Sequence, residues 1–498
     1  MQSNGKIFWA SFLTLIAAGM GFAVRGKVLG EWEVAFGFTK TELGTITGGG
    51  LTGMAFTIIG FSLFADRVGY KLLLIGAFLL HVSSAAVTLA ATPVFEASGK
   101  DMTYWCLFVG MFMFSLANGM CEAAINPLVA TLYPKQKTHY LNILHAGWPG
   151  GLILGGLLAF GFVGETAKVQ HLRWEIPMMF FLVPTLWYGS IVIKEKFPIS
   201  EARAAGVKFG EMLAEFAAPV LLFLLFLHAL VGYVELGTDS WITNITQPKL
   251  EAIGIDSVLL LVYTAGLMFV LRFFAGPIVE HINPLGLLFV SALLGCAGLY
   301  SMGIVLAGDA GWSLLVAATV YGVGKTFLWP TMLGVVGERF PKGGALAMGA
   351  MGGVGMLSAG LLGGPGIGYT QDVNASAKLE ESSPTAYAEV KNDKPDKFLF
   401  LEPVSGFDGT KVEELRTKNP AEYDLVKQAS EYGGEEALKV TAAIPATMAV
   451  GYLLLLIYFR ATGGYKLVEI GPGGKEVETS HRPTAQETVY KDSRADQA

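Results

Sequence analysis

Two apolar stretches of this 498-residue sequence share a layout in which one charged residue interrupts the hydrophobic run. The first begins at Gly119 and reads GMCEAAINPLVATLYPK, and the second begins at Gly322 and reads GVGKTFLWPTMLGVVGERFPK. In each, the charge (Glu122 or Lys325) lies five positions before a proline, and an aromatic–Pro–Lys sequence follows. Because an ionisable group is costly to bury in an apolar segment, we interpret both charges as functional residues that face one site from opposite sides.

Glu122 is the first candidate for proton chemistry. Its sequence neighbours from Met120 to Ile125 are all apolar. A carboxyl group balanced between desolvation and a nearby cation can bind and release a proton. We therefore predict that Glu122 takes part in proton coupling, and that Glu235 is a second coupling acid unless it forms a structural ion pair with Arg25.

Polar and aromatic residues in the same segments could hold a solute. Asn126 follows Glu122 by four residues and shares its helix face, and amide groups can donate to and accept from hydroxyl groups. Tryptophan and tyrosine rings can stack on the apolar face of a sugar, although each alone can equally pack in a core or anchor at the membrane interface. We predict a binding site formed by Arg25, Asn126, Asn142, His145, Trp148, Tyr233, Asp239, Trp241, Lys325 and Trp329.

The other intramembrane ionisable residues leave alternatives open. His145 and His228 could relay protons, or each could simply donate a hydrogen bond to a backbone carbonyl. Asp239 and Arg272 lie nearer to predicted helix ends, where a structural ion pair or contact with water is the alternative explanation.

The elements that carry these residues are membrane helices. The sequence is 52% hydrophobic and only 15% charged, whereas charged residues make up about 25% of a typical soluble domain. Apolar segments of roughly 20 residues, the length that crosses a bilayer, recur along the chain. We predict an all-α integral membrane protein with twelve spans near residues 7–30, 41–65, 72–92, 103–131, 138–163, 174–194, 217–245, 256–280, 285–307, 312–337, 343–368 and 440–461.

A mixed-charge linker, KEKFPISEARAAGVKFGEM, divides these spans into six and six. We expect one helical bundle over residues 1–195, a linker over 196–216 and a second bundle over 217–461. Lysine and arginine cluster in the short loops on the linker's side, so the positive-inside rule places both termini and the linker in the cytoplasm. The protein is therefore expected in a cell membrane, plasma or bacterial inner.

Residues 369–438 interrupt the pattern between the last two spans. This segment is polar and rich in Lys, Glu and Pro, and a connection of such length is usually functional or disordered. We expect an external insertion containing one or two amphipathic helices. The final residues, 462–498, are expected to form a polar cytoplasmic tail.

The two six-span halves repeat further features. The second span is followed by SLFADRVGYK and the eighth by GPIVEHINPLG, and each loop has an acid followed by a glycine. The fifth and eleventh spans are both rich in glycine. Two related six-helix halves are typical of transporters that hold a solute between repeats near the membrane midplane.

Several motifs resemble one family. The loop ADRVGYK resembles that between helices two and three of the major facilitator superfamily, although Ser62 replaces the usual glycine. GMCEAAINPLVATLYPKQKTHYLNILHAGWPGG, VGYVELGTDSW and WPTMLGVVGERFPKGGALAMGAMGG resemble the branch of the fucose permease and sodium-dependent glucose transporters. The resemblance implies pseudo-symmetric six-helix halves, a central-cavity role for Glu122 in proton coupling, and a gating role for Asp66 and Arg67. Arg25 departs from the pattern, because the fucose permease has an acid near this place.

We therefore expect a secondary active transporter, working as a monomer, that couples a proton or sodium ion to symport of a sugar or similar polar solute. The first alternative is an organic anion such as a sugar acid, because Arg25 and Lys325 would suit a negative solute. The second is a membrane sensor that does not transport. We identify no nucleophile–base arrangement, metal-ligand spacing, cofactor motif or nucleotide-binding loop, and the net charge of −6 does not favour nucleic acid.

Overall fold

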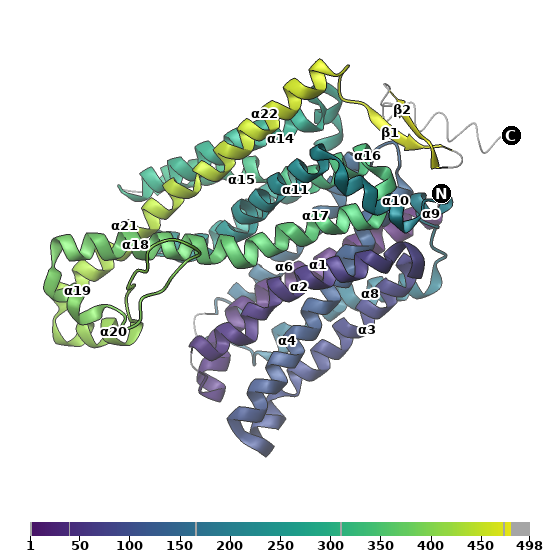
Figure 1. Ribbon diagram of the computed structural model, residues 1–498. Helices are drawn as coiled ribbons and strands as arrows, with labels where there is room; N and C mark the ends of the chain where they lie inside the picture. The colour runs from purple at the N-terminus through teal and green to yellow at the C-terminus, as the bar shows by residue number, and fades with distance from the viewer. Residues whose placement is uncertain (1, 39, 165–166, 309–310, 472–473, 480–498) are drawn as a thin grey trace.

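The structure is a computed structural model that describes residues 2–38, 40–164, 167–308, 311–471 and 474–479. Its helices form two bundles, which are packed together at one end and diverge toward the other (Figure 1). The start of α1, the end of α22 and the linker helices all lie at the packed end, which we call the terminus end.

The first bundle corresponds to the first six predicted spans. Its fifth and sixth spans are each divided into two helices. The helices are α1 (Gln2–Phe36), α2 (Lys40–Val68), α3 (Tyr70–Leu89), α4 (Ala91–Leu132), α5 (Lys137–His145), α6 (Gly147–Phe162), α7 (Glu175–Met179) and α8 (Leu182–Lys194). The linker that follows contains α9 (Glu201–Ala204), α10 (Phe209–Ala214) and the short helix η1 (Glu215–Ala217).

The second bundle corresponds to the remaining six spans, and several of these are also divided. Two of its segments are single turns of π-helix, η2 and η4. The elements are α11 (Pro219–Gly232), η2 (Tyr233–Gly237), α12 (Thr238–Glu251), α13 (Val258–Arg272), α14 (Ala275–Leu306), α15 (Gly311–Lys325), α16 (Leu328–Arg339), η3 (Pro341–Gly343), α17 (Gly344–Ser358), η4 (Ala359–Gly363), α18 (Gly364–Ser382), α21 (Pro420–Thr441) and α22 (Ala443–Ala461).

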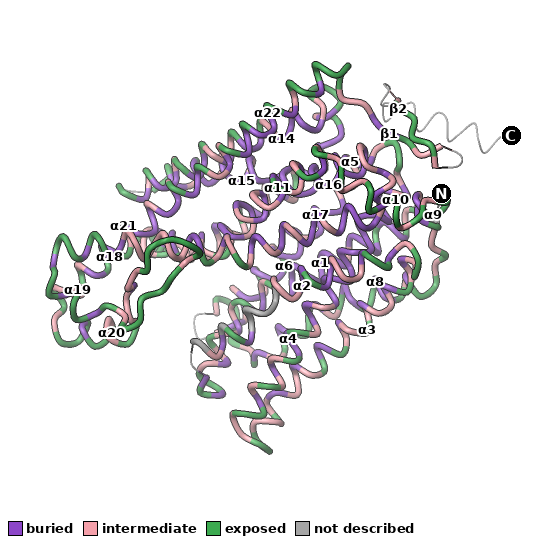
Figure 2. Tube along the Cα trace, viewed as in Figure 1, coloured by how far each residue is buried: buried purple, intermediate pink, exposed green. Residues whose placement is uncertain are grey.

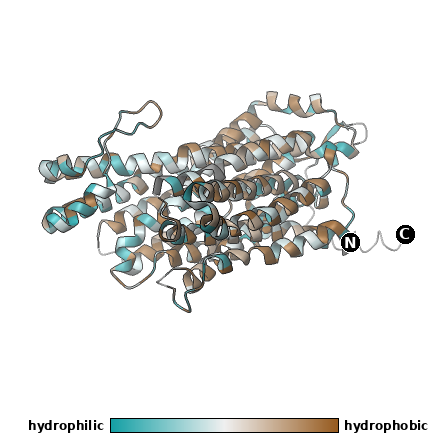
Figure 3. Cartoon of the chain, turned by 90° about the horizontal axis from the view of Figure 1, so that it is seen from below, coloured by the Kyte–Doolittle hydropathy of each residue, from teal (hydrophilic) through white to brown (hydrophobic). Residues whose placement is uncertain are grey.

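The chain is a multi-pass membrane protein with the predicted all-α fold. Among the described residues, nine helical stretches are long and apolar enough to cross a membrane, and α13 is a shorter apolar helix. Hydrophobic residues predominate along the bundles (Figure 3), and the buried residues follow the helix faces that meet inside them (Figure 2). This pattern is consistent with twelve spans.

The backbone bends inside two continuous helical stretches, α14 and α4. Asn283 has a φ of 53° within α14 and precedes Pro284, so the eighth span contains α13 and the first turns of α14, and the ninth follows the bend. Gly99 has a φ of 74° within α4, and a helical turn therefore precedes the predicted start of the fourth span.

The segment between the last two spans is helical and has its own core. It contains the end of α18, α19 (Pro384–Val390), α20 (Gly409–Lys418) and the start of α21. Its buried apolar side chains, Leu379, Ala386, Val390, Leu415, Val426 and Ala429, form a separate cluster. This insertion extends beyond the bundles at the end opposite the terminus end (Figure 1). A hairpin of β1 (Leu467–Ile470) and β2 (Glu476–Thr479) follows α22.

Glycine allows the helices of the second bundle to approach closely. A Cβ atom at Gly232 of α11 would lie 2.0 Å from the carbonyl oxygen of Gly355 in α17, and one at Gly324 would lie 2.3 Å from the backbone nitrogen of Gly295. Such backbone-to-backbone contacts are typical of packed membrane helices, where small residues take the place of a hydrophobic driving force.

We expect Gly232→Ala to destabilise the protein by about 1–3 kcal/mol, because its methyl group would overlap backbone atoms that cannot move independently. Gly266→Ala is the matched control, since a Cβ there meets nothing within 4 Å. Thermal unfolding in detergent measures both variants. Equal unfolding temperatures for the two would contradict the close approach of α11 and α17.

Candidate functional site

The two bundles contact each other at the terminus end through α5 and α16. The hydroxyl group of Thr138 donates to Oε1 of Glu338 over 2.6 Å, and Nδ2 of Asn142 donates to Oγ1 of Thr331 over 3.1 Å. All four side chains are buried. The structure therefore places Asn142, a predicted binding residue, in the contact between the bundles.

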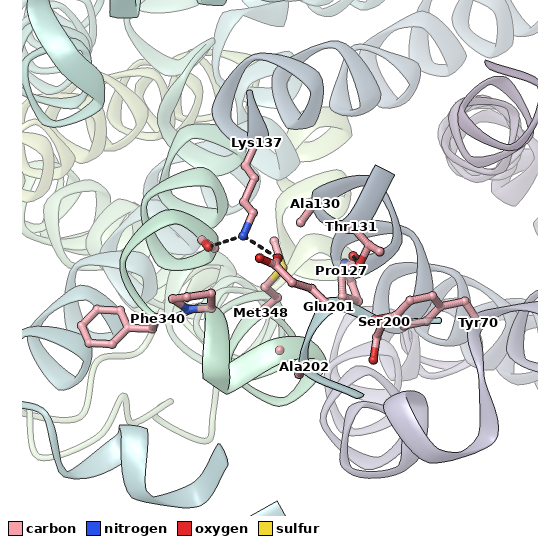
Figure 4. A pocket seen from close by; sticks show the side chains of 13 residues that line it. Tyr70, Pro127, Ala130, Thr131, Lys137, Ser200, Glu201, Ala202, Phe340 and Met348 are labelled. Carbon is pink, nitrogen blue, oxygen red and sulfur yellow. Dashed lines mark hydrogen bonds and ion pairs between the residues drawn. The ribbon is translucent and has the colours of Figure 1, made fainter. Parts of the chain in front are cut away.

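The linker reinforces this contact. Lys137 at the start of α5 is buried, and its ammonium group donates to Oε2 of Glu201 in α9 over 2.8 Å and to the carbonyl oxygen of Gly337 in α16 over 3.0 Å (Figure 4). One side chain thus connects the first bundle to both the linker and the second bundle.

Asp66, the predicted gating acid, also joins the bundles. Its Oδ1 accepts a hydrogen bond from the hydroxyl of Tyr70 over 2.9 Å, and its Oδ2 accepts one from the backbone N–H of Ala345 over 3.1 Å. Ala345 lies in the first turn of α17, where the partial positive charge of a helix N-terminus favours a carboxylate. Arg67 instead lies over the ring of Phe209 in the linker, 5.4 Å from its centroid.

Ser62, the residue that departs from the family motif, meets a glycine of the opposite bundle. A Cβ atom at Gly349 of α17 would lie 1.8 Å from its Oγ atom. The serine is therefore accommodated because residue 349 has no side chain.

Two sets of hydrogen bonds, joined only by the covalent bonds of His145, connect the two predicted coupling acids. Nδ2 of Asn126 donates to Oε2 of Glu122 over 2.7 Å, and Nε2 of His145 donates to Oδ1 of Asn126 over 2.9 Å. The backbone carbonyl of His145 accepts from Nη1 of Arg272 over 2.6 Å, and Nη2 of Arg272 pairs with Glu235 over 3.0 Å. Together they extend from α4 of the first bundle to η2 of the second, and all five side chains are buried.

Local structure explains these positions. Glu122 and Asn126 lie one helical turn apart in α4, so their side chains meet on one face. Arg272 is the last residue of α13. Its Nε also donates to the backbone carbonyl of Thr326, the first residue after the end of α15. Glu235 lies in the π-helical turn η2, and such turns frequently occur at functional sites.

Lys325 is paired with an acid of its own bundle. It forms an ion pair with Asp239 of α12, and its ammonium group lies 5.1 Å from the ring centroid of Tyr321. Within the described part of the chain, neither a Glu122–Lys325 nor a Glu235–Arg25 ion pair is present. Arg272 and Lys325 are each paired with an acid of the second bundle, and the placement of Glu122 and Lys325 on opposite sides of one site stays a prediction.

Arg25 is buried without a hydrogen-bond acceptor among the described residues. Its side chain is 3% exposed, and none of its three guanidinium nitrogens has a partner there. The guanidinium carbon lies 3.3 Å from the ring centroid of Phe114 and 5.1 Å from that of Phe181. A desolvated cation–π contact contributes about 2 kcal/mol, which only partly offsets the loss of hydration.

The predicted aromatic residues are distributed over several helices. Trp148 contacts Phe22, with 5.6 Å between ring centroids, and Trp329 packs 4.6 Å from the ring of His228. Trp241 donates through its indole N–H to the carbonyl of Gly364 over 2.8 Å. Tyr233 belongs to η2 and is half-buried. These residues do not form one stacked cluster.

Sequence reasoning did not identify Lys137, Thr138 and Glu338 as a contact between the bundles. In the sequence, Lys137 appears only as one positive charge of a short loop, and Glu338 lies in the repeat that contains Lys325. Their partners are 64 to 200 residues away in the sequence, so their spacing carries no signal of the pairing.

The sequence matches the model of the Major Facilitator Superfamily over residues 7–364. The chain belongs to the Major Facilitator Superfamily. A search of curated proteins finds no match. Membership agrees with the twelve-helix fold and with the resemblance of the loop motifs.

Solved structures of this superfamily share the fold. FucP, the E. coli fucose:proton symporter, superposes in its outward conformation with a TM-score of 0.59 at 15% identity, covering 89% of this chain and 98% of its own. The proton:xylose symporter XylE superposes with a TM-score of 0.65 at 12% identity, and the match covers 90% of this chain and 95% of XylE. The human organic anion transporter MFSD10 superposes with a TM-score of 0.57 at 13% identity, and the match covers 90% of this chain and 99% of MFSD10. At these identities the likeness concerns the fold alone.

We expect Lys325→Ala to destabilise the protein by about 3–5 kcal/mol, because it leaves the carboxylate of Asp239 without its cation. The double variant Lys325→Ala/Asp239→Ala should recover part of that loss. Thermal unfolding of both single variants and the double variant gives the coupling between the two residues. A single variant as stable as the unmodified protein would show that the pair makes no net contribution.

We expect Lys137→Met to weaken the contact at the terminus end, because it removes the bonds to Glu201 and Gly337 and leaves an apolar side chain of similar length. The measurement is the distance between spin labels attached to α5 and α16, which should become longer on average. Lys135→Met is the control, since Lys135 is exposed. An unchanged distance distribution would show that Lys137 does not help to hold the two bundles together at the terminus end.

Proposed function

We propose that this protein is a secondary active transporter that works by alternating access and couples a proton to the symport of a sugar or similar small polar solute. The observation that supports this proposal is the pair of hydrogen-bonded sets that meet at His145: its ring is linked through Asn126 to Glu122, and its backbone carbonyl is linked through Arg272 to Glu235. It connects a buried acid of each bundle across the boundary along which the bundles must move.

Coupling follows from the chemistry of this chain. An ionised Glu122 accepts the Asn126 amide hydrogen bond strongly, because charge-assisted hydrogen bonds are about twice as strong as neutral ones. Protonation weakens that bond and frees Asn126 and His145 to change partners. His145 lies on the same helix as Thr138 and Asn142, so its movement would reach the residues that hold the terminus end closed.

The positions of the charged loops support the proposal that this conformation of the transporter is open to the outside of the cell. The terminus end carries the linker and many of the positively charged short loops, which are retained in the cytoplasm. Closure at that end leaves the bundles diverging toward the opposite side of a plasma or bacterial inner membrane. The insertion between the last two spans, which contains the end of α18, then lies outside the cell.

The solute class rests on side chains and on the fold relatives. Amides and aromatic rings, such as those of Asn126, Trp148 and Trp329, suit hydroxyl groups and the apolar face of a sugar. FucP and XylE are named as fucose:proton and proton:xylose symporters. A transporter that couples a sodium ion in place of the proton, or a sensor that does not transport, would have the same fold. Neither would require Glu122 to change its protonation.

We expect Glu122→Gln to abolish accumulation of solute driven by a pH gradient, because glutamine keeps the shape and the hydrogen-bond acceptor but cannot ionise. Exchange of solute between the two sides of the membrane should remain. The measurement is uptake of fucose, xylose and glucose into proteoliposomes, with and without an imposed pH gradient.

Glu280→Gln provides the control, since Glu280 is an exposed acid at the terminus end. Full pH-driven accumulation by Glu122→Gln would remove this residue from coupling. Uptake that follows a sodium gradient and ignores the pH gradient would replace the proton by sodium.

A further inference from the structure

We propose that Arg25 binds the carboxylate of the transported solute, so that the substrate class is a small organic acid such as a sugar acid. This inference rests on the proposed transport function and makes its solute more specific. The basis is a difference in pairing among the buried cations of the membrane part. Arg272 and Lys325 each have a carboxylate partner, whereas Arg25 has none among the described residues.

The side chains around Arg25 do not neutralise it. His81 lies close enough for the charge of Arg25 to act on it, but its Nε2 donates to Oδ1 of Asn118 over 3.0 Å and its Nδ1 accepts from the hydroxyl of Tyr188 over 2.9 Å. These three groups are engaged with one another. A buried guanidinium in this environment requires an anion or water as its partner.

The stacking of Arg25 leaves its donors in a suitable geometry for an oxyanion. At 3.3 Å from the centroid of Phe114, the guanidinium must lie nearly parallel to the ring. Its N–H groups then point sideways, away from the ring, where they can form two parallel hydrogen bonds to one carboxylate. Lysine lacks this planar fork.

An exposed aromatic residue adjoins this position. Phe22 lies three residues before Arg25 on α1, is 46% exposed and contacts Trp148. Residues three apart are neighbours on a helix surface. A solute with its carboxylate on Arg25 could therefore place its apolar face against Phe22 and Trp148.

The test is ligand-dependent thermal unfolding of the purified full chain in detergent, which needs no transport. The ligands are D-glucuronate, D-gluconate, lactate, glucose 6-phosphate, D-glucose and sodium chloride at equal ionic strength. We expect a carboxylate to raise the unfolding temperature of the unmodified protein with a saturable dose response, and D-glucose to have no comparable effect.

Arg25→Met should abolish the response to carboxylates, and Arg25→Lys should raise the apparent Kd about tenfold or more through loss of the bidentate hydrogen bonds. Without ligand, Arg25→Met should unfold at the same temperature as the unmodified protein or higher, because an unpaired buried charge is removed. Lys27→Met, a half-buried cation on the same helix, should respond like the unmodified protein.

Three results would overturn the inference. One is the absence of any carboxylate response in the unmodified protein, and another is an equal response in Arg25→Met. The third is stabilisation by chloride or by glucose 6-phosphate alone, which would assign Arg25 to an inorganic anion or a phosphate. If carboxylates bind through Arg25 but no uptake occurs, the transport proposal fails and the site remains. If pH-driven uptake occurs for neutral sugars alone, the transport proposal stands and the carboxylate site fails.

Discussion

The cost of holding charge inside a membrane governs the arrangement of this protein. Removing an ion from water is unfavourable by several kcal/mol even after the protein relaxes, and the described structure answers this cost with specific partners. Arg272 is held by Glu235 and by two backbone carbonyls. Lys325 is held by Asp239. The acid Glu122 has an amide of its own helix, whereas Arg25 has only aromatic rings as neighbours among the residues that the structure describes.

Helix α5 connects the buried charges to the closed end of the molecule. Thr138, Asn142 and His145 occupy one face of this short helix, because their spacing of four and three residues follows the helical period. The first two contact α16, and the third contacts α4 and Arg272. A rearrangement near Glu122 would therefore be transmitted to the contact at the terminus end by one short helix, which contacts the second bundle along its length and α4 at its last residue.

At the terminus end, glycines of the second bundle allow hydroxyl side chains of the first bundle to lie directly against the backbone of the opposite helix. Gly349 faces Ser62, and a Cβ at Gly334 would lie 2.4 Å from Oγ1 of Thr138. At both places the glycine belongs to the second bundle and the hydroxyl residue to the first. Apolar side chains pack beside these contacts, because one hydrophobic cluster includes Ile58 of the first bundle and Met348 of the second.

The sequence by itself determined the membrane class, the twelve-helix fold and the short set of buried ionisable residues. Segment length and hydropathy are local in the chain, and the repeat of Glu122 and Lys325 can be read by comparing two segments of the sequence. It also placed Glu122 and Asn126 on one face, since four residues make about one helical turn.

Only the tertiary structure decided which charges meet. Lys325 pairs with Asp239 and Glu235 with Arg272, at separations of 86 and 37 residues, and the spacing of these residues in the sequence does not indicate which of them meet. The contact of Lys137 with Glu201 and Gly337 was likewise decided by packing. Hydropathy and spacing report how each helix meets the membrane, whereas ion pairing depends on the rotation of each helix and its distance from its neighbours, which are set by packing between helices far apart in the sequence.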